Sequence, residues 1–181
     1  YRRASFLLDS AGKTVFPEHV TITEQPHLAR GLGSAPFDGE GAQTQERKLI
    51  DRGVLTGYVL SSYSARRLNL APTGNAGGVH NLSVSSDAGD FASLVRQMGR
   101  GLVVTSLMGF GVNMVTGDYS RGASGFWVEN GEIAFPVEEI TIAGNLADLF
   151  RRIVAVGSDV DRRGNIQSGS ILIESMTVAG S

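Results

Sequence analysis

The chain has 181 residues, of which 41% are hydrophobic and 19% are charged, so it can bury one sizeable core and resembles neither a disordered tail nor a solenoid. Its formal net charge of -2 supplies no positive field to hold a polyanion, although its 16 basic residues include only Lys13 and Lys48 as lysines. We therefore expect one domain that does not bind nucleic acid.

The absence of certain residue types and runs also bounds the function. There is no cysteine, which excludes a disulfide framework and a thiolate metal site. No apolar run approaches the roughly eighteen residues that span a bilayer, and no charged-then-apolar leader opens the sequence. These features predict a soluble, cytoplasmic protein with no membrane partner.

Strand and turn signals alternate through the first third of the chain. Arg3–Asp9 has the pattern of a strand already under way, with no methionine and no cap before it, so we interpret the chain as a fragment of a longer one. A turn at 11–12, a strand over 20–23 and a long loop over 25–43 are predicted next. Asp51-Arg52-Gly53 then joins strands over 46–50 and 54–61 in a hairpin, because glycine accepts the positive φ that such turns need.

Two helices and a second hairpin are predicted further on. Phe91, Leu94, Val95 and Met98 have helical spacing behind Asp90, a helix cap. The segment 146–154 has the same spacing behind Asn145, with Gly157 just past its end. Asn130-Gly131 makes a two-residue turn between the arms of 126–135, and a closing strand lies near 170–178. Each helix has one apolar stripe, so the predicted fold class is α+β, a mostly antiparallel β-sheet with two or three short helices packed on it.

Two glycine motifs resemble nucleotide-binding loops without meeting their requirements. GKT at 12–14 has Leu7 where a phosphate-binding loop has its first glycine. GFGVNM at 109–114 has Met114 in place of the third glycine of a dinucleotide fingerprint, and no amphipathic helix follows. We interpret the first as a plain turn and the second as a bulge or a close contact between strands.

The histidines give no clear zinc motif. A helical metallopeptidase motif places two histidines one turn apart on the same face. His19 and His27 are instead eight residues apart across a proline, with Glu24 nearby, and no helix aligns them. Surface or hydrogen-bonded histidines are the simpler interpretation.

The remaining polar residues give no catalytic constellation. Ser120 and Ser124 lack the spacing of a nucleophile elbow, and no histidine follows them. Glu138 and Glu139 would point to opposite faces of a strand, so they cannot act together as acid and base. We therefore assign no catalytic residue and no metal ligand in this chain.

Long stretches of the sequence resemble one protein family. Met114 to Val160 is similar to the carboxy-terminal part of the TldD/PmbA family, also called peptidase U62 or modulator of DNA gyrase, and within it to the PmbA/TldE branch. Four further segments match the same family in the same order, so the resemblance covers essentially the whole chain. It implies that residues 1–181 are the single carboxy-terminal domain of a TldD/PmbA-type protein whose amino-terminal part is absent. They are SFLLDSAGKTVFP (5–17), PFDGEGAQT (36–44), SSYSARRLNLAPTGNAGG (61–78) and NIQSGSILIESMTVAG (165–180).

The resemblance implies one half of a metallopeptidase. TldD-type chains carry an HExxxH zinc motif in their amino-terminal region, and they pair with a PmbA/TldE-type chain in a heterodimer that degrades unfolded peptides inside a closed chamber. The PmbA/TldE type lacks that motif. The resemblance thus implies a noncatalytic subunit, with zinc in the TldD-type partner and peptides as substrates.

One position can be carried over from the TldD type. A cysteine near its carboxy terminus completes the zinc site, and the corresponding residue here is Ser168. A neutral hydroxyl is a poor replacement for a thiolate, because zinc prefers deprotonated sulfur. We therefore expect this chain not to complete a zinc site.

The same resemblance suggests which segments contact a partner subunit or a peptide. Glycines allow a close approach of main chains and aromatic side chains provide anchors, although Phe126 and Trp127 point to opposite faces and one of them should be core. The candidates are Asp38, Glu40, Gly74, Asn75, Gly77, Gly78, Tyr119 and Trp127. Three functions stay open: the noncatalytic subunit, an independent metallopeptidase with ligands in the amino-terminal part, and a protein-binding module, with self-association as an alternative to the TldD-type partner.

Overall fold

The elements of the chain are mostly short strands, and the computed structural model describes residues 1–180. In chain order they are β1 (Ile22–Glu24), β2 (Arg47–Asp51), β3 (Val54–Leu55), α1 (Ser62–Leu68), β4 (Leu82–Val84), α2 (Phe91–Met98), β5 (Gly101–Met108), β6 (Asp118–Glu129), β7 (Glu132–Asn145), α3 (Leu146–Arg151), β8 (Ile153–Val156), β9 (Ile166–Gln167), β10 (Ile171–Ile173) and β11 (Thr177–Ala179). These elements confirm the predicted α+β class.

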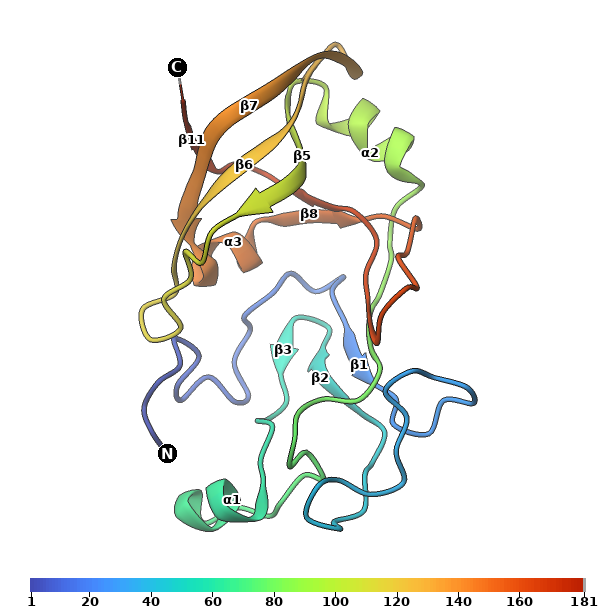
Figure 1. Ribbon diagram of the computed structural model, residues 1–181, viewed down its shortest axis with the longest axis vertical. Coiled ribbons are helices and arrows are strands. Elements are labelled where there is room, and N and C mark those ends of the chain that lie inside the picture. The colour runs from blue at the N-terminus through green and yellow to red at the C-terminus, as the bar shows by residue number, and fades with distance from the viewer. Residues whose placement is uncertain (181) are drawn as a thin grey trace.

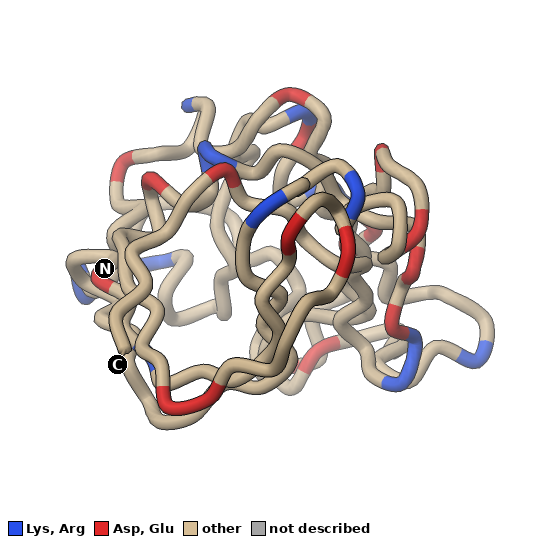
Figure 2. The backbone as a smooth tube through the Cα atoms, turned by 90° about the horizontal axis from the view of Figure 1, so that it is seen from above, with Lys and Arg blue, Asp and Glu red and all other residues tan. Residues whose placement is uncertain are grey.

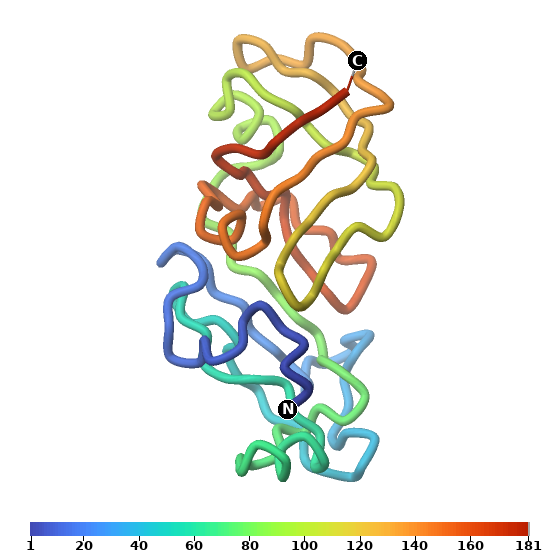
Figure 3. The backbone as a smooth tube through the Cα atoms, turned by 90° about the vertical axis from the view of Figure 1, so that its left-hand side faces the viewer, coloured from blue at the N-terminus to red at the C-terminus, as the bar shows by residue number. Residues whose placement is uncertain are grey.

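The strands form two main sheets that lie one above the other (Figure 1, Figure 3). The lower sheet has five strands in the order β3-β2-β1-β4-β9, and the upper sheet has four in the order β11-β7-β6-β5. A two-stranded pair of β8 and β10 completes the set. Within residues 1–180 the one parallel pairing is that of β4 with β9, which brings the red carboxy-terminal loop down to the lower sheet.

The larger hydrophobic core joins the lower sheet to elements of the second half of the chain. Ile50 and Leu55 from β2 and β3 are buried together with Ile153 and Val156 from β8. The Phe16 and Phe150 rings stack with their centroids 4.5 Å apart. A smaller cluster, Ala123, Ile140 and Ile142, lies on the upper sheet. Burial of apolar side chains from both ends of the chain therefore holds the two halves together.

The structure corrects the prediction for the start of the chain. Arg3–Asp9 is not a strand but a series of turns, in which the Leu8 and Ser10 amides donate to the Ser5 and Leu7 carbonyls. Its apolar residues are nonetheless used, because Leu7 packs on the larger core and the Phe6 ring lies 5.9 Å from that of Phe150. The segment was predicted as a strand because it is apolar, but its serines favour turns and it pairs with no neighbouring strand.

The two predicted hairpins are both present with different lengths. The second arm of the first hairpin is only Val54–Leu55. Residues 56–61, which were predicted to continue this strand, are not strand. The hairpin at Asn130-Gly131 is much longer than predicted, because β6 and β7 pair from Glu129↔Glu132 out to Asp118↔Asn145. Both turn residues have positive φ, at 52° and 76°, as a two-residue hairpin turn requires.

Two predicted elements in the second half are divided in the structure. The helix predicted over 146–154 ends at Arg151, and Ile153–Val156 is the strand β8, which pairs with β10. The strand predicted over 170–178 is two strands, β10 and β11, that belong to different sheets. β-branched residues such as Ile153 fit a helical spacing and a strand equally well, and tertiary pairing decided between them.

The helix predictions were otherwise incomplete rather than wrong. The helix over 91–98 is confirmed as α2, with the Asp90 side chain accepting from the Ser93 amide at its start. The sequence pattern missed α1, whose cap is Ser61 and whose only buried residue is Ala65. A helix with so little buried surface has almost no periodic signal.

Candidate binding site

A buried carboxylate organises one end of the lower sheet. Along β1, Ile22 faces the larger core and Glu24, two residues on, lies on the same face of the strand. The Glu24 side chain is only 1% exposed. A carboxylate that loses its water is costly to bury unless other groups replace the lost hydrogen bonds and charge.

Three residues, Arg47, Asn75 and His80, supply the hydrogen bonds and the charge that Glu24 loses on burial. Arg47 is paired with Glu24 across β1 and β2, and its Nε donates to Oε2 at 3.0 Å. The other oxygen, Oε1, accepts from Asn75 Nδ2 at 2.7 Å and from the His80 backbone amide at 2.8 Å. Both oxygens of Glu24 are therefore hydrogen-bonded, and one partner carries the opposite charge.

Asn75 extends this network into the glycine-rich loop PTGNAGG. Its Oδ1 accepts from Arg47 Nη2 at 2.7 Å and from Thr73 Oγ1 at 2.8 Å, while Nδ2 also donates to the Gly78 carbonyl at 3.1 Å. Arg47 Nη1 reaches the Tyr58 carbonyl at 3.1 Å. The side chain of Asn75, which is buried, thus fixes the loop from inside.

Asp38 ties the second glycine-rich loop, PFDGEG, to the first. Its Oδ2 accepts from the Ala76 amide at 2.9 Å, and its Oδ1 accepts from the Glu40 and Ala42 amides at 2.9 Å each. The Ala76 amide, aided by the other two, stabilises the charged form and lowers the pKa of the Asp38 carboxyl. Asp38 is buried, so it too acts by shaping the loops.

The remaining loop candidates differ in their exposure to solvent. Glu40 is exposed, and its Oε2 accepts from the Ser62 amide at the start of α1 at 2.8 Å; the Ser62 side chain and this amide together lower the pKa of the Glu40 carboxyl. Gly74 is buried with φ of 72°, and a Cβ there would lie 2.5 Å from the Gln43 carbonyl oxygen. Gly77 and Gly78 are exposed, and a Cβ at either position would meet no atom within 4 Å. We call residues 36–44 and 73–80 together the glycine-loop platform; its exposed glycines are Gly39, Gly41, Gly77 and Gly78.

Tyr119 and Trp127 do not belong to the glycine-loop platform. Both lie on β6 in the upper sheet, whereas the platform adjoins the lower sheet near α1 (Figure 1). Tyr119 packs against the smaller core. Trp127 is partly exposed; its Nε1 donates to Glu129 at 3.2 Å, and the Arg100 guanidinium lies 5.8 Å from the ring centroid. The prediction that either Trp127 or Phe126 is core was wrong, because both are partly exposed and neither belongs to a core cluster.

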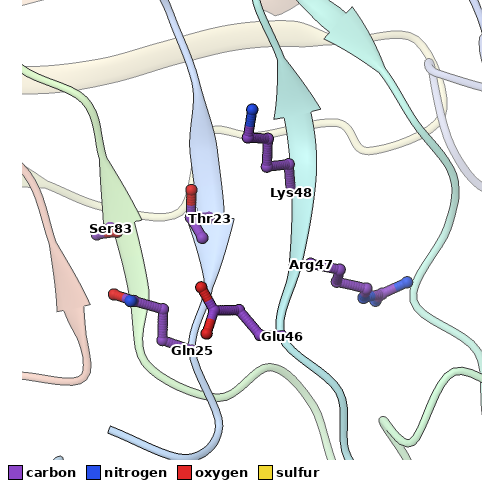
Figure 4. A pocket seen from close by; sticks show the side chains of 6 residues that line it. All are labelled: Thr23, Gln25, Glu46, Arg47, Lys48 and Ser83. Atoms are coloured by element: carbon purple, nitrogen blue, oxygen red, sulfur yellow. The ribbon is translucent and has the colours of Figure 1, made fainter.

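A depression of the lower sheet lies on the face opposite to Glu24. Lys48, Thr23 and Ser83 are cross-strand neighbours on β2, β1 and β4 and form a polar row along it (Figure 4). The depression has a volume of about 580 Å³ and also borders Gln25 and Glu46. None of the candidates lines it, and it lacks the apolar walls of a typical small-molecule site.

The donor set does not fit a zinc ion. His19 Nε2 lies 3.7 Å from an Asp87 oxygen, and His27 Nε2 lies 3.0 Å from Thr44 Oγ1, so the two histidines have separate partners. Among residues 1–180 no three histidine or acidic side chains gather as metal ligands. The Ser168 hydroxyl donates to the Gly169 carbonyl at 2.9 Å. Zinc needs about three or four close donors, which this arrangement does not offer.

The carboxylates near Ser168 are occupied by local bonds. Asp159 accepts from the Ser170 hydroxyl at 2.6 Å, which lowers the pKa of its carboxyl. The Arg163 side chain lowers the pKa of Asp161 to about 2. Glu138 and Glu139, the neighbouring acidic residues considered in the sequence analysis, are both exposed. Glu139 has a φ of 54° and lies at an irregularity in the pairing of β7 with β6. No pair of carboxylates among these therefore faces a shared cleft as acid and base.

Charge is spread over the fold without a single dominant patch. Basic and acidic positions are both distributed around the backbone in this view (Figure 2). No helix within residues 1–180 has the length and hydrophobicity needed to cross a bilayer.

Comparison with known proteins identifies the family. The family model described as PmbA/TldA metallopeptidase C-terminal domain matches residues 1–180. The curated metalloprotease PmbA of Escherichia coli O157:H7 is 57% identical over 180 residues, which are 99% of this chain and 40% of that protein. The chain therefore belongs to the PmbA/TldD metallopeptidase family and corresponds to its carboxy-terminal domain, spanning about two fifths of the length of this relative.

Solved structures agree with this assignment. A putative modulator of DNA gyrase from Thermotoga maritima superposes with a TM-score of 0.90 at 40% identity, covering 98% of this chain and 43% of that one. TldE from Thermococcus kodakarensis has the same fold, with a TM-score of 0.84 at 23% identity over 98% of this chain and 46% of its own. The resemblance read from the sequence motifs is thus confirmed.

The Glu24 network predicts a large effect of one substitution. Glu24→Ala leaves the Arg47 guanidinium and two buried donors without their acceptor, so we expect the full-length protein to lose about 3–5 kcal/mol of unfolding free energy. Urea denaturation measures this loss. The exposed Glu46, which immediately precedes β2, gives the matched control Glu46→Ala, for which a change within about 0.5 kcal/mol is expected. A loss below about 1 kcal/mol for Glu24→Ala would contradict the role assigned to it.

The hydrogen bonds to Asp38 predict that the difference in stability between wild type and Asp38→Asn depends on pH. Its pKa is lowered in the fold, so it stabilises the protein above its unfolded pKa of about 3.9, and this contribution is lost as pH falls through the lower folded value. Asp38→Asn cannot accept from all three amides and should be less stable than wild type at pH 7. The gap in urea midpoint between the two full-length proteins should narrow as the pH is lowered from 6 to 3. A gap that stays constant over this range would count against the assignment.

Proposed function

We propose that this chain is the carboxy-terminal domain of a noncatalytic, PmbA/TldE-type subunit that pairs with a TldD-type zinc subunit to process unfolded peptides. The observation that carries the proposal is the donor set around Ser168. The position that holds a cysteine in TldD-type chains has a hydroxyl here, already bonded to Gly169, and within residues 1–180 no cluster of ligand groups surrounds it. Similarity to a metalloprotease PmbA and the TldE-like fold support the coarser part of the proposal, that the chain is of the PmbA/TldE type.

In this proposal the domain contributes walls and contacts rather than chemistry. The glycine-loop platform is rigid underneath, because Glu24, Asp38 and Asn75 saturate its inner polar groups. Its outer main chain at Gly77 and Gly78 has no side chain to exclude a neighbouring strand. Contacts to main chain suit peptides of varied sequence, since every peptide offers the same amide groups.

An independent metallopeptidase is the second candidate. The curated relative is itself named a metalloprotease, and this chain spans 40% of its length, so ligands elsewhere in the full-length protein would satisfy the name without a partner. The two functions differ in where the zinc resides.

Zinc content separates the two functions. We expect elemental analysis to find essentially no zinc in the full-length protein purified alone and about one zinc per heterodimer with the TldD-type subunit, because only the partner supplies a complete donor set. Peptide hydrolysis should occur only in the samples that contain zinc, and a chelator should abolish it. One zinc per chain in the lone protein would refute the noncatalytic assignment.

A variant of this chain provides the control. Ser168→Ala removes the hydroxyl that replaces the family's cysteine, and it should change neither the zinc content nor the hydrolysis rate of the heterodimer. A loss of zinc in Ser168→Ala would show that the hydroxyl is a ligand, contrary to the proposal.

A further inference from the structure

The turn of the long β6–β7 hairpin contains the one Asn-Gly pair of the sequence, Asn130-Gly131. Asparagine is a chemically labile residue, and a following glycine makes it more so, because glycine has no side chain to shield its amide nitrogen. Asn130 is also exposed to solvent. The turn that the hairpin requires is therefore also a place where the chain can be modified without an enzyme.

The modification is deamidation. The Gly131 amide nitrogen gives up its proton and bonds to the side-chain carbonyl carbon of Asn130, while the bond from that carbon to the side-chain nitrogen breaks and ammonia leaves. Water then opens the five-membered ring at one of its two carbonyls, which gives aspartate or isoaspartate. The reaction consumes one water, releases one ammonia and needs no other reactant.

The native turn directs the attacking nitrogen away from its target. The φ values of Asn130 and Gly131 are 52° and 76°, and two positive values define the mirror image of a type I turn. In that turn the ψ of the first central residue is about +30°, which points the next nitrogen away from the side chain of the same residue. Ring closure needs a large rotation about this bond, and the pairing of Glu129 with Glu132 opposes it.

The same nitrogen is held by the end of α2. Gly131 is buried, and its amide donates to the carbonyl of Gly99, the residue that caps α2, at 2.8 Å. A Cβ on Gly131 would lie 3.1 Å from the Arg96 Cα, so the turn rests on the last turn of the helix (Figure 1). We call this bond and this packing the α2–turn contact. The amide proton cannot leave while the contact is closed.

We propose that Asn130 is a modification site whose deamidation is gated by the α2–turn contact. When the turn lifts from α2, the Gly131 nitrogen becomes free both to rotate and to lose its proton. Proteins open locally in this way without unfolding completely. The native rate of deamidation is then the rate of an open chain multiplied by the fraction of molecules in which the turn is open. This inference is independent of the proposed function.

The products do not fit the closed turn. Isoaspartate adds one carbon to the main chain between residues 130 and 131, and a two-residue turn with fixed pairing on both sides has no room for it. Aspartate adds a negative charge between Glu129 and Glu132 and beside the carbonyl end of α2, where the helix dipole disfavours it. Deamidation is therefore a one-way record that the turn has opened.

Mass spectrometry of the full-length protein tests the gate. After incubation at neutral pH, tryptic cleavage releases residues 122–151, in which deamidation of Asn130 is located by fragmentation. A synthetic peptide of residues 124–137 gives the open-chain rate, since an isolated hairpin is at best marginally stable. We expect the native rate to be lower than the peptide rate by about tenfold or more. Equal rates would refute the gate, and a peptide that stays intact would refute the site.

Leu94→Ala tests whether α2 is the gate. Leu94 is 5% exposed in α2, and its truncation weakens the packing of the helix without altering the turn. We expect it to accelerate the deamidation of Asn130 in the native protein by about fivefold or more. Leu149→Ala is the matched control, because Leu149 is equally buried but lies in α3. It should leave the rate within about twofold of wild type.

The two variants separate the possible errors. Equal acceleration by both would mean that global unfolding exposes the site, which contradicts a local gate. A low native rate that Leu94→Ala leaves unchanged would assign the protection to another contact, such as one with the amino-terminal part of the full-length protein, and would overturn the proposal. If Leu94→Ala does not fold, the comparison of wild-type protein with the peptide still decides whether the fold protects Asn130.

Discussion

The burial of one carboxylate governs the lower half of the molecule. Glu24 occupies a position on the core face of β1 that the alternation of the strand would give to an apolar residue. It can remain there only while Arg47, Asn75 and His80 are in place. The register of β1 with β2 and the path of the PTGNAGG loop are therefore coupled to one another through a single side chain.

This coupling explains why a polar cluster lies under a glycine-rich surface in this chain. Glycines free a loop to adopt unusual φ values but also leave it with many alternative conformations. The side chains of Asp38 and Asn75 remove those alternatives from below by bonding to the loop amides and carbonyls. A loop with bare main chain outside and fixed polar groups inside suits contact with another main chain better than it suits catalysis.

Exposed polar and apolar groups lie in different parts of the domain. The glycine-loop platform lies at the lower sheet, near α1, while exposed apolar side chains lie on β5 and on the loop that joins it to β6, in the upper sheet (Figure 1). The first region exposes main chain at glycines and the second exposes apolar side chains.

The sequence predicted the parts of the fold that local signals determine. Asn130-Gly131 and the spacing behind Asp90 are short-range patterns, and the hairpin and α2 are where they indicate. The end of α3 was mispredicted because Ile153 and Val154 satisfy a helical stripe, and only pairing with β10 makes them strand. The two arms of 170–178 join different sheets for the same long-range reason.

The candidate site was predicted in outline only. The glycine motifs located the loops, but Glu24, Arg47 and His80, which fix them, were not singled out. The signal was present, since Val20, Ile22 and Glu24 have the period of a strand and so place an acid among core residues. Its partners could not be read from the sequence, because His80 lies 56 positions away and reaches Glu24 only in the folded chain.

The parallel pairing of β4 with β9 has a consequence for synthesis on the ribosome. Leu82 lies beside Ile166, so the lower sheet cannot be completed until nearly the whole domain has emerged. Until then the edge of β4 stays unpaired, and Val156, whose amide donates to Asp87 at 2.7 Å, has not arrived to fix the segment after it. Contacts between such distant residues slow folding and prolong the exposure of apolar strands. The lower sheet is therefore completed only late in the synthesis of the domain.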